Sequence, residues 1–269
     1  WGHAEVPIES SDVAGGRGGF VINGIDAYDY SGRSVSGAGD VNGDGLDDLI
    51  VGASGADPSD ANMAGESYVV FGKTSGSAVE LLTIASGAGG FVINGIDAFD
   101  ESGFSVSGAG DVNGDGLDDL IAGAPGADAG GVPFAGESYV VFGKASGTAV
   151  ELSTVASGTG GFVINGIDVG DRSGHSVSGA GDVNGDGLDD LIIGGWGADA
   201  NGVLAAGESF VVFGKTSGAA VTLSSIALGT GGFVINGIDA DDYSGFFRLG
   251  RRGCQWRRVR RSHRRGMGS

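Results

Sequence analysis

Hydrophobic residues in this chain fall into short runs that are bounded by glycine-rich polar segments. In one representative stretch the runs are Ser34–Ser36, Asp48–Val51, Ser67–Phe71 and Phe91–Asn94. They are enriched in Val, Ile, Tyr and Phe, which favours strands over helices. A helix is conceivable only at Ala78–Ile84, and we expect no helix there. The pattern therefore predicts an all-β chain.

Three phrases recur at a constant interval of 71 residues. GFVINGID begins at Gly19, Gly90, Gly161 and Gly232, DVNGDGLDDL begins at Asp40, Asp111 and Asp182, and GES(Y/F)VVFGK begins at Gly65, Gly136 and Gly207. Four antiparallel strands per repeat, in series, are what the blades of a β-propeller need. A solenoid, in which each repeat stacks only on its neighbours, is the alternative architecture.

The repeat predicts how the chain is divided. Residues 1–31 would end a truncated upstream blade, residues 32–102, 103–173 and 174–244 would form three full blades, and residues 245–269 would belong to a fourth repeat. Three blades leave the ring incomplete. We therefore expect further blades to come from sequence beyond this chain or, as the alternative, from self-association.

The C-terminal residues depart abruptly from the repeat. From Phe247 onward there are nine arginines and no acids. Codons allowed for Gly253 to Arg258 (GGA TGT CAA TGG CGA CGG) encode Asp-Val-Asn-Gly-Asp-Gly when shifted by one base, at the register where the repeat expects that phrase. We interpret this segment as a frameshifted repeat, so Cys254 and His263 are not candidates for a metal or nucleophile site.

Charge separates the repeats from this segment. The chain has 58 glycines and a formal charge of −19, but residues 1–246 contain six basic residues against 34 acids, a charge of −28. Such an acidic surface repels nucleic acid and anionic membranes and attracts multivalent cations. No apolar run approaches the 18 residues needed to span a membrane, so we expect no membrane insertion.

The phrase DVNGDGLDD has the chemistry of a calcium loop. It places oxygen-bearing groups at positions 1, 3, 5, 7 and 9, and Ca²⁺ prefers six to eight such ligands. The expected ligands are Asp40, Asn42, Asp44, Leu46 (through its carbonyl) and Asp48 in the first loop; Asp111, Asn113, Asp115, Leu117 and Asp119 in the second; and Asp182, Asn184, Asp186, Leu188 and Asp190 in the third. The leucine side chain is expected to turn towards the core.

Two other interpretations of the loop are weaker. An EF-hand needs flanking helices and a glutamate at position 12, where this chain has apolar strand residues. A polar turn that binds nothing would leave three clustered acids per loop without compensation. A strand-flanked loop that binds one Ca²⁺ per full repeat is the prediction.

These motifs resemble the FG-GAP repeats of integrin α-subunit propellers and their bacterial relatives. The FG element matches Phe71-Gly72, Phe142-Gly143 and Phe213-Gly214, and the GAP element matches Gly123-Ala124-Pro125 fully, Gly52-Ala53-Ser54 nearly and Gly194-Gly195-Trp196 poorly. The resemblance implies a propeller, usually of seven blades, with calcium at one rim between strands one and two and ligand binding often on the opposite face.

Other acidic residues suggest structural roles. Asp26 and Asp29, with their repeats, would cap turns through backbone hydrogen bonds, with a second cation site as the alternative. No histidine recurs beside the repeated serines, so the sequence offers no hydrolase triad. The loops 57–63, 128–134 and 199–204 differ most between repeats, which suits surface loops that carry ligand specificity.

Together these features predict a non-enzymatic, calcium-binding, extracellular or cell-surface propeller segment that serves adhesion or the binding of a protein or glycan ligand. Two alternatives remain: a spacer in a large repetitive surface protein, and a non-catalytic accessory module of a secreted hydrolase.

Overall fold

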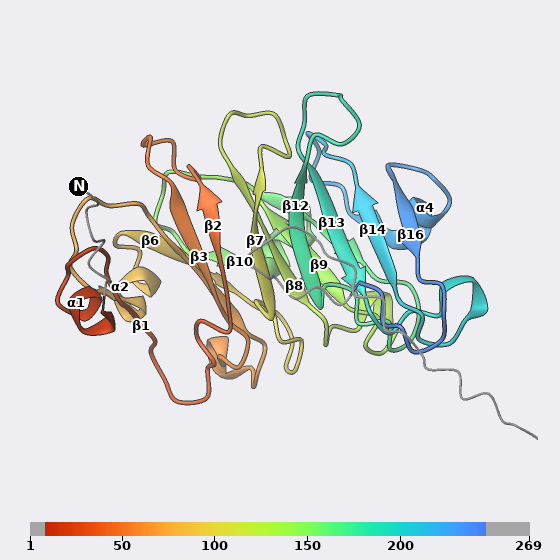
Figure 1. Cartoon of the computed structure of the whole chain (residues 1–269), viewed down its shortest axis with the longest axis horizontal. Coiled ribbons are helices and arrows are strands. Elements are labelled where there is room, and N and C mark those ends of the chain that lie inside the picture. Colours follow the sequence, from red (N-terminus) through yellow and green to blue (C-terminus); the bar gives the residue numbers. More distant parts are fainter. Residues whose placement is uncertain (1–8, 246–269) are drawn as a thin grey trace, which may run out of the picture.

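The computed structural model describes residues 9–245, and the frameshifted segment predicted for the C-terminus lies almost entirely outside them. The described chain is all-β, with three four-stranded antiparallel blades (Figure 1). The first blade contains β2 (Ser34–Gly39), β3 (Asp48–Ala53), β4 (Glu66–Val70) and β6 (Gly90–Asn94). The second contains β7 (Ser105–Gly110), β8 (Asp119–Ala124), β9 (Glu137–Val141) and β11 (Gly161–Asn165). The third contains β12 (Ser176–Gly181), β13 (Asp190–Gly195), β14 (Glu208–Val212) and β16 (Gly232–Asn236).

The three blades share one topology and one register. Strands follow each other in space as they do in sequence, from inner β2 through β3 and β4 to outer β6. In the first blade Val35 faces Val51 across the inner pair, and a register shift between Gly37 and Gly39 marks a bulge just before the loop to β3. The same bulge stands in the other two blades. A bulge bends its strand and re-aims the residues after it, so all three loops leave their blades in the same way.

A fifth, two-residue strand joins the outer edge of a blade from the following repeat, which the sequence pattern did not predict. These strands are β5 (Val79–Glu80), β10 (Val150–Glu151) and β15 (Val221–Thr222), and they pair in parallel with β1 (Ile22–Asn23), β6 and β11, respectively. The side chains add a further link, because Asn94 Nδ2 donates to Glu151 Oε1 at 2.8 Å. Each repeat is therefore tied to its predecessor at the outer rim.

Short helices correct the expectation of a helix-free repeat. Five-residue helices occur at α1 (Ser10–Ala14), α2 (Leu81–Ala85), α3 (Leu152–Ala156) and α4 (Leu223–Ala227), and 3₁₀ turns at Pro58–Asp60, Ala129–Gly131 and Ala200–Gly202. The helix forms at α2 because Leu81 and Ile84, three residues apart, are both buried on one face, while Gly87 ends it with a positive φ of 89°. Tertiary burial outweighed the β propensity of the segment.

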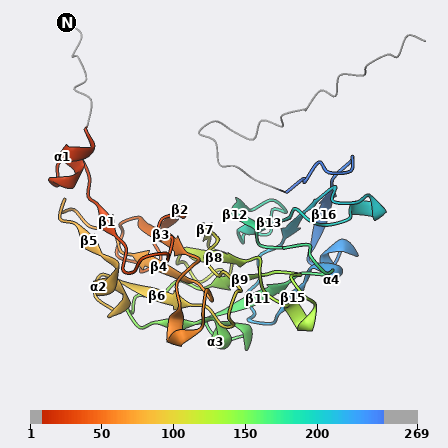
Figure 2. The ribbon, with the colours of Figure 1, turned by 90° about the horizontal axis from the view of Figure 1, so that it is seen from below.

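The blades are arranged around an arc as in a propeller, not stacked as in a solenoid (Figure 2). The inner strands β2, β7 and β12 gather on the inside of the arc, and α2, α3 and α4 lie on its outside. Serine, glycine and alanine let the inner strands approach closely: a Cβ at Gly108 would lie 2.8 Å from Gly37 O, and Val106 N–H donates to Ser34 Oγ at 3.0 Å. The described blades do not close a ring.

The apolar core lies between successive blades. One cluster joins Phe91 and Val69 of the first blade to Val106 and Tyr139 of the second, and another joins the second blade to the third. On the face of the first blade that has no full neighbouring blade, Phe20 and Ile22 pack against the cluster of Val51 and Tyr68, whereas Val35 on the inner strand is 58% exposed. Burial therefore depends on a blade's position in the row and not only on its sequence.

Candidate metal-binding loops

The three predicted calcium loops lie at one end of the blades, between the inner strand and the second strand of each (Figure 1, upper edge). This is the position expected from the sequence. In the first loop Asp40 follows β2 and Asp48 opens β3. The loops after β3, β8 and β13, which include the 3₁₀ turns, lie at the opposite end of these strands.

Side chains at positions 1, 3 and 5 accept hydrogen bonds from backbone N–H groups of their own loop. In the first loop Asp40 Oδ1 accepts hydrogen bonds from the backbone N–H groups of Gly43 (2.8 Å) and Asp44 (3.0 Å), and its Oδ2 accepts from Gly45 (2.9 Å). Asn42 Oδ1 accepts from Asp44 N–H at 2.8 Å, and Asn42 Nδ2 donates to Asp44 Oδ2 at 3.1 Å. The second and third loops repeat this network bond for bond.

The turn geometry requires the two glycines. Gly43 and Gly45 have φ values of 76° and 87°, in the left-handed region where a side chain is strained. The equivalent glycines of the second and third loops also have positive φ. These two positive-φ residues let the backbone curl so that the Asp40 carboxylate meets three successive amides.

Position 9 is a buried carboxylate that ties the loop to the FG element. Asp48 is fully buried; its Oδ2 accepts from Val41 N–H at 3.0 Å and its Oδ1 from Gly72 N–H at 2.7 Å. A side chain at Gly72 would collide with Leu46, because a Cβ there would lie 2.6 Å from the leucine Cβ. The glycine of the FG element is thus explained by this contact.

In the first two loops, burial disfavours the charged form of the position-9 aspartate. Desolvation raises the pKa of Asp48 above its ordinary value. For Asp119 of the second loop, desolvation raises the pKa to about 7, opposed by the Gly143 N–H hydrogen bond and reinforced by the negative charges of Asp115 and Asp111. A divalent cation beside these carboxylates would stabilise their charged forms.

The leucine at position 7 does not turn towards the core, so that expectation was wrong. Leu46 is 40% exposed. Leu117 and Leu188 are half-buried and lie against the preceding loop instead: a Cβ at Gly43 would be 3.0 Å from Leu117 Cδ2, and one at Gly114 would be 2.9 Å from Leu188 Cδ2. The side chain serves contact between loops, while its carbonyl remains the expected ligand.

The donor set fits a hard cation in its chemistry. Every proposed ligand atom is an oxygen, the nine-residue phrase has no basic residue, and a carboxylate oxygen that accepts one hydrogen bond keeps a further lone pair. Across residues 9–245, however, no three acidic, histidine or cysteine side chains are already grouped around a metal position. Calcium at these loops is therefore a proposal.

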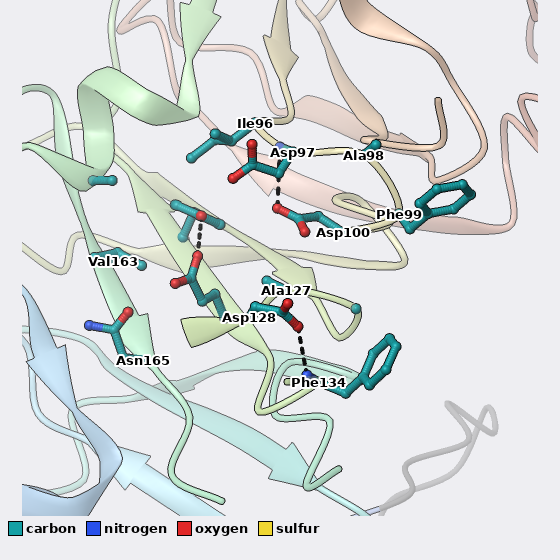
Figure 3. Close-up of a pocket in the computed structure, with 14 residues that line it drawn as sticks. Ile96, Asp97, Ala98, Phe99, Asp100, Ala127, Asp128, Phe134, Val163 and Asn165 are labelled. Carbon is teal, nitrogen blue, oxygen red and sulfur yellow. Dashed lines mark hydrogen bonds between the residues drawn. The ribbon is translucent and has the colours of Figure 1, made fainter. Parts of the chain in front are cut away.

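The turns that contain Asp26 and Asp29, and their repeats, are capped through the backbone. Asp29 Oδ2 accepts from Asp26 N–H at 3.2 Å, and Asp100 and Asp171 accept the equivalent bonds from Asp97 and Asp168. The second of these turns borders a cavity of about 540 Å³ at the end opposite the loops (Figure 3). Burial raises the pKa of Asp100 there to about 7.

The sequence pointed to the variable loop 128–134 and to Asp97 and Asp100 as turn caps, but it did not show that they border one cavity. Phe99 and Phe134 lie on one side of it, with Asp97 and Asp100 beside the first ring and Asp128 beside the second (Figure 3). Asp128 Oδ1 accepts from Phe134 N–H at 2.8 Å, which holds the variable 128–134 loop in place. The available signal was variation: position 134 is phenylalanine only in the second repeat, where the other repeats have Met63 and Ala205.

The comparisons with known proteins agree with this geometry. A family model of the FG-GAP repeat matches residues 31–70 and 102–141, which span the inner strand, the loop and the next two strands of the first two blades. The chain is built from FG-GAP repeats. The FG-GAP resemblance stated from the sequence is confirmed, and so is the all-β propeller fold.

Curated proteins similar to the chain include integrin α-subunits. The chain is 32% identical over 199 residues to integrin alpha pat-2 of Caenorhabditis elegans, an alignment that covers 70% of this chain and 15% of that protein. It is 30% identical over 190 residues to integrin alpha-IIb of Mus musculus, covering 69% and 17%. It is also 29% identical over 198 residues to a phosphatidylinositol-glycan-specific phospholipase D of Dictyostelium discoideum, covering 69% and 20%. The chain thus spans a fifth or less of these relatives.

The part of the chain that the structure describes contains no helix of the length and hydrophobicity needed to cross a bilayer.

Proposed function

We propose that this chain is a calcium-stabilised propeller segment that acts in adhesion or ligand binding outside the cell, without catalysis of its own. The observation that carries the proposal is the threefold loop in which the side-chain oxygens of Asp40, Asn42 and Asp44, and of their repeats, accept backbone N–H groups of the same loop beside a buried position-9 carboxylate. The similarity to integrin α-subunits supports the adhesion role and the cell-surface location.

The cation would act on stability first. Asp40, Asn42, Asp44 and Asp48, with the carbonyl of Leu46, would hold it in the first loop, and the equivalent residues would do so in the others. It would neutralise carboxylates that now rely on backbone amides. Because binding to the folded form alone adds to folding free energy, calcium should raise the melting temperature.

Ligand recognition would take place at the opposite end. There the near-identical repeats differ, and the cavity beside Phe99 and Phe134 is lined by the turn before β7 and the loop after β8, together with residues of β9, α3 and β11. A protein or glycan ligand would meet four acidic side chains and two exposed aromatic rings at this cavity. The acidic surface argues against nucleic acid as the partner.

A second candidate is favoured by one relative. The similarity to a phospholipase D suggests that such repeats accompany an enzyme, in which case this chain would be a non-catalytic accessory module. A spacer role is a third candidate, supported by the near-identity of the repeats. An array of glycans and extracellular proteins would separate a spacer, which binds none, from an adhesin.

The first experiment is a thermal melt of the full chain, followed by circular dichroism, in 5 mM calcium and in excess chelator; 5 mM is roughly ten times the midpoint of weak extracellular sites. We expect a cooperative transition that calcium raises, and loss of this response in Asp44→Ala/Asp115→Ala/Asp186→Ala. The matched control is Asp26→Asn/Asp97→Asn/Asp168→Asn, which removes three charges at the other end of the blades. Identical melts in both buffers would show that the loops do not bind calcium.

A further inference from the structure

The eighth residue of the loop phrase has no ligand role in the proposed site. In the second and third loops it forms hydrogen bonds with the loop of the preceding blade. Asp118 of the second loop accepts a hydrogen bond at Oδ2 from Asp40 N–H (2.8 Å), and its own N–H donates to Asp40 O (3.3 Å). Asp189 of the third loop holds Asp111 in the same way, at 2.9 and 3.1 Å. We call this two-bond contact the loop clamp.

The loop clamp holds the residue that organises the preceding loop. The Asp40 carboxylate accepts three amides of its own loop, while its backbone N–H and C=O are both taken by Asp118. A hydrogen bond to an ionised acceptor is stronger than a neutral one. Asp118 therefore fixes the backbone from which the first expected ligand projects.

The space for the loop clamp is provided by glycine. A Cβ at Gly39 would lie 2.1 Å from Asp118 Oδ2, and one at Gly110 would lie 2.0 Å from Asp189 Oδ2. At Gly181, the equivalent position of the third loop, a Cβ would meet nothing within 4 Å. All three glycines have positive φ, but only the first two also make room for a neighbouring carboxylate.

The loop clamp also stands next to two expected ligands of its own loop. Asp118 lies between Leu117, whose carbonyl is the expected position-7 ligand, and Asp119 at position 9. A cation in the second loop would fix the backbone on both sides of Asp118. Because Asp118 bonds to the backbone of Asp40, a cation that orders the second loop would also order position 1 of the first loop.

We propose that Asp118 and Asp189 are positioning residues that couple the loops into one row, so that a cation in one loop strengthens binding in the loop before it. This inference rests on the proposed calcium binding. By thermodynamic linkage the effect is reciprocal: a cation in the first loop strengthens binding in the second by the same factor.

The chain contains its own control. Asp47 is the eighth residue of the first loop, and among residues 9–245 no loop of this type precedes it; its carboxylate has no hydrogen-bond partner there. Asp47→Ala and Asp118→Ala remove the same group from the same loop position. Only Asp118→Ala removes a loop clamp, and Asp118→Asn keeps an acceptor for Asp40 N–H while removing the charge.

The first measurement is amide hydrogen exchange by NMR on the full chain in excess chelator. Asp118→Ala should speed exchange of the Asp40 amide about tenfold, the factor that corresponds to loss of one charge-assisted hydrogen bond. The Asp111 amide, held by Asp189, should keep its rate and report that the protein is folded. Asp47→Ala should change neither rate.

The second measurement is a calcium titration of the same variants, with the amides of Gly45, Gly116 and Gly187 as reporters of the three loops. Asp118→Ala should weaken binding in the first loop about tenfold, and Asp118→Asn should restore most of it. Asp115→Ala, which disables the second loop, should weaken the first loop in the presence of Asp118 but have no further effect in Asp118→Ala.

The outcomes separate the two proposals. If the loops bind calcium but Asp118→Ala matches Asp47→Ala in both measurements, the coupling is wrong and calcium binding stands. If no loop amide responds to calcium in the unaltered chain, calcium binding is wrong and the coupling falls with it. A drop in first-loop affinity that Asp118→Asn does not relieve would contradict a positioning role through the accepted hydrogen bond.

Discussion

The second and third blades have nearly the same sequence but different surroundings, and their loops and outer strands differ accordingly. Asn113 in the second loop is 8% exposed, whereas its equivalent in the third loop is exposed; Phe162 on β11 is fully buried, whereas Phe233 on β16 is 40% exposed. Among residues 9–245, the second blade has a neighbouring blade on both sides and the third has one on only one side. The stability of a propeller blade thus depends partly on the blades packed against it.

The largest test of this comparison removes the same aromatic ring from both blades. Phe162→Ala should destabilise by about 3–5 kcal/mol, because it empties a fully buried site that also packs under the Lys215 ammonium. Phe233→Ala should cost less than half as much. Chemical denaturation of each variant, with unchanged m-values as the check on two-state behaviour, measures both. Equal losses would mean that the following blade contributes nothing to the site.

The next test adds a methyl group before each loop. Gly110→Ala introduces backbone strain at φ 73° and a clash with Asp189, and should cost about 2–4 kcal/mol. Gly181→Ala introduces only the strain at φ 69°, about 1 kcal/mol. The difference in midpoint temperature measures the clash. If the two variants have the same melting temperature, the Asp189 carboxylate is not in contact with Gly110 in solution.

Acid should stabilise the turn before the second blade more than the turn before the third. Burial raises the pKa of Asp100 to about 7 and that of Asp171 to about 6, so in each case the folded state holds a proton more tightly than the unfolded one. Their contribution to stability is therefore greatest at low pH and is lost as pH rises from about 4 through the folded pKa.

The substitution that isolates this effect is Asp100→Asn, which keeps an acceptor for Asp97 N–H. It should stabilise the protein by about 1–2 kcal/mol at pH 8 and have little effect at pH 4, with Asp171→Asn showing a smaller gain. Melts across that pH range provide the measurement. A gain that is the same at both pH values would point to packing and not to ionisation.

The smallest effect concerns the outer rim. Asn94→Ala removes the hydrogen bond to Glu151 and should cost about 0.5–1 kcal/mol. Asn165 faces Thr222 in the equivalent register, and Asn165→Ala should be close to neutral. Double-mutant cycles with Glu151→Ala and Thr222→Ala give the two coupling energies. No coupling between Asn94 and Glu151 would show that the backbone pairing alone holds the fifth strand.

The repeat period made most of the fold predictable. Because GFVINGID and DVNGDGLDDL recur in register, the four strands of each blade and the position of the loops could be derived from one repeat and applied to three. The ligand list stays a prediction, since the loop's polar side chains are seen bonded to amides of the loop. The network itself is built on glycines at positive φ in each loop.

The features that escaped prediction depend on neighbours. Val79–Glu80 is too short to stand out as a strand and exists because β1 of the preceding repeat offers a partner. Leu117 looked like a core residue, but it packs on the preceding loop. Asp118 was visible in the motif, yet nothing in one repeat shows that its partner lies 78 residues earlier. Contacts between repeats leave no signal in a pattern read within one repeat.

The fifth strand has a consequence for synthesis on the ribosome. The outermost strand of a blade comes from the next repeat. In the first blade, Asn94 hydrogen-bonds to Glu151, which is 57 residues further along the chain. At about 5–20 residues per second, each newly made blade keeps an open edge for roughly 3–10 s. During that interval an identical edge on a neighbouring nascent chain could pair with it. Translation speed through each repeat thus becomes a determinant of whether the blades join in their own chain.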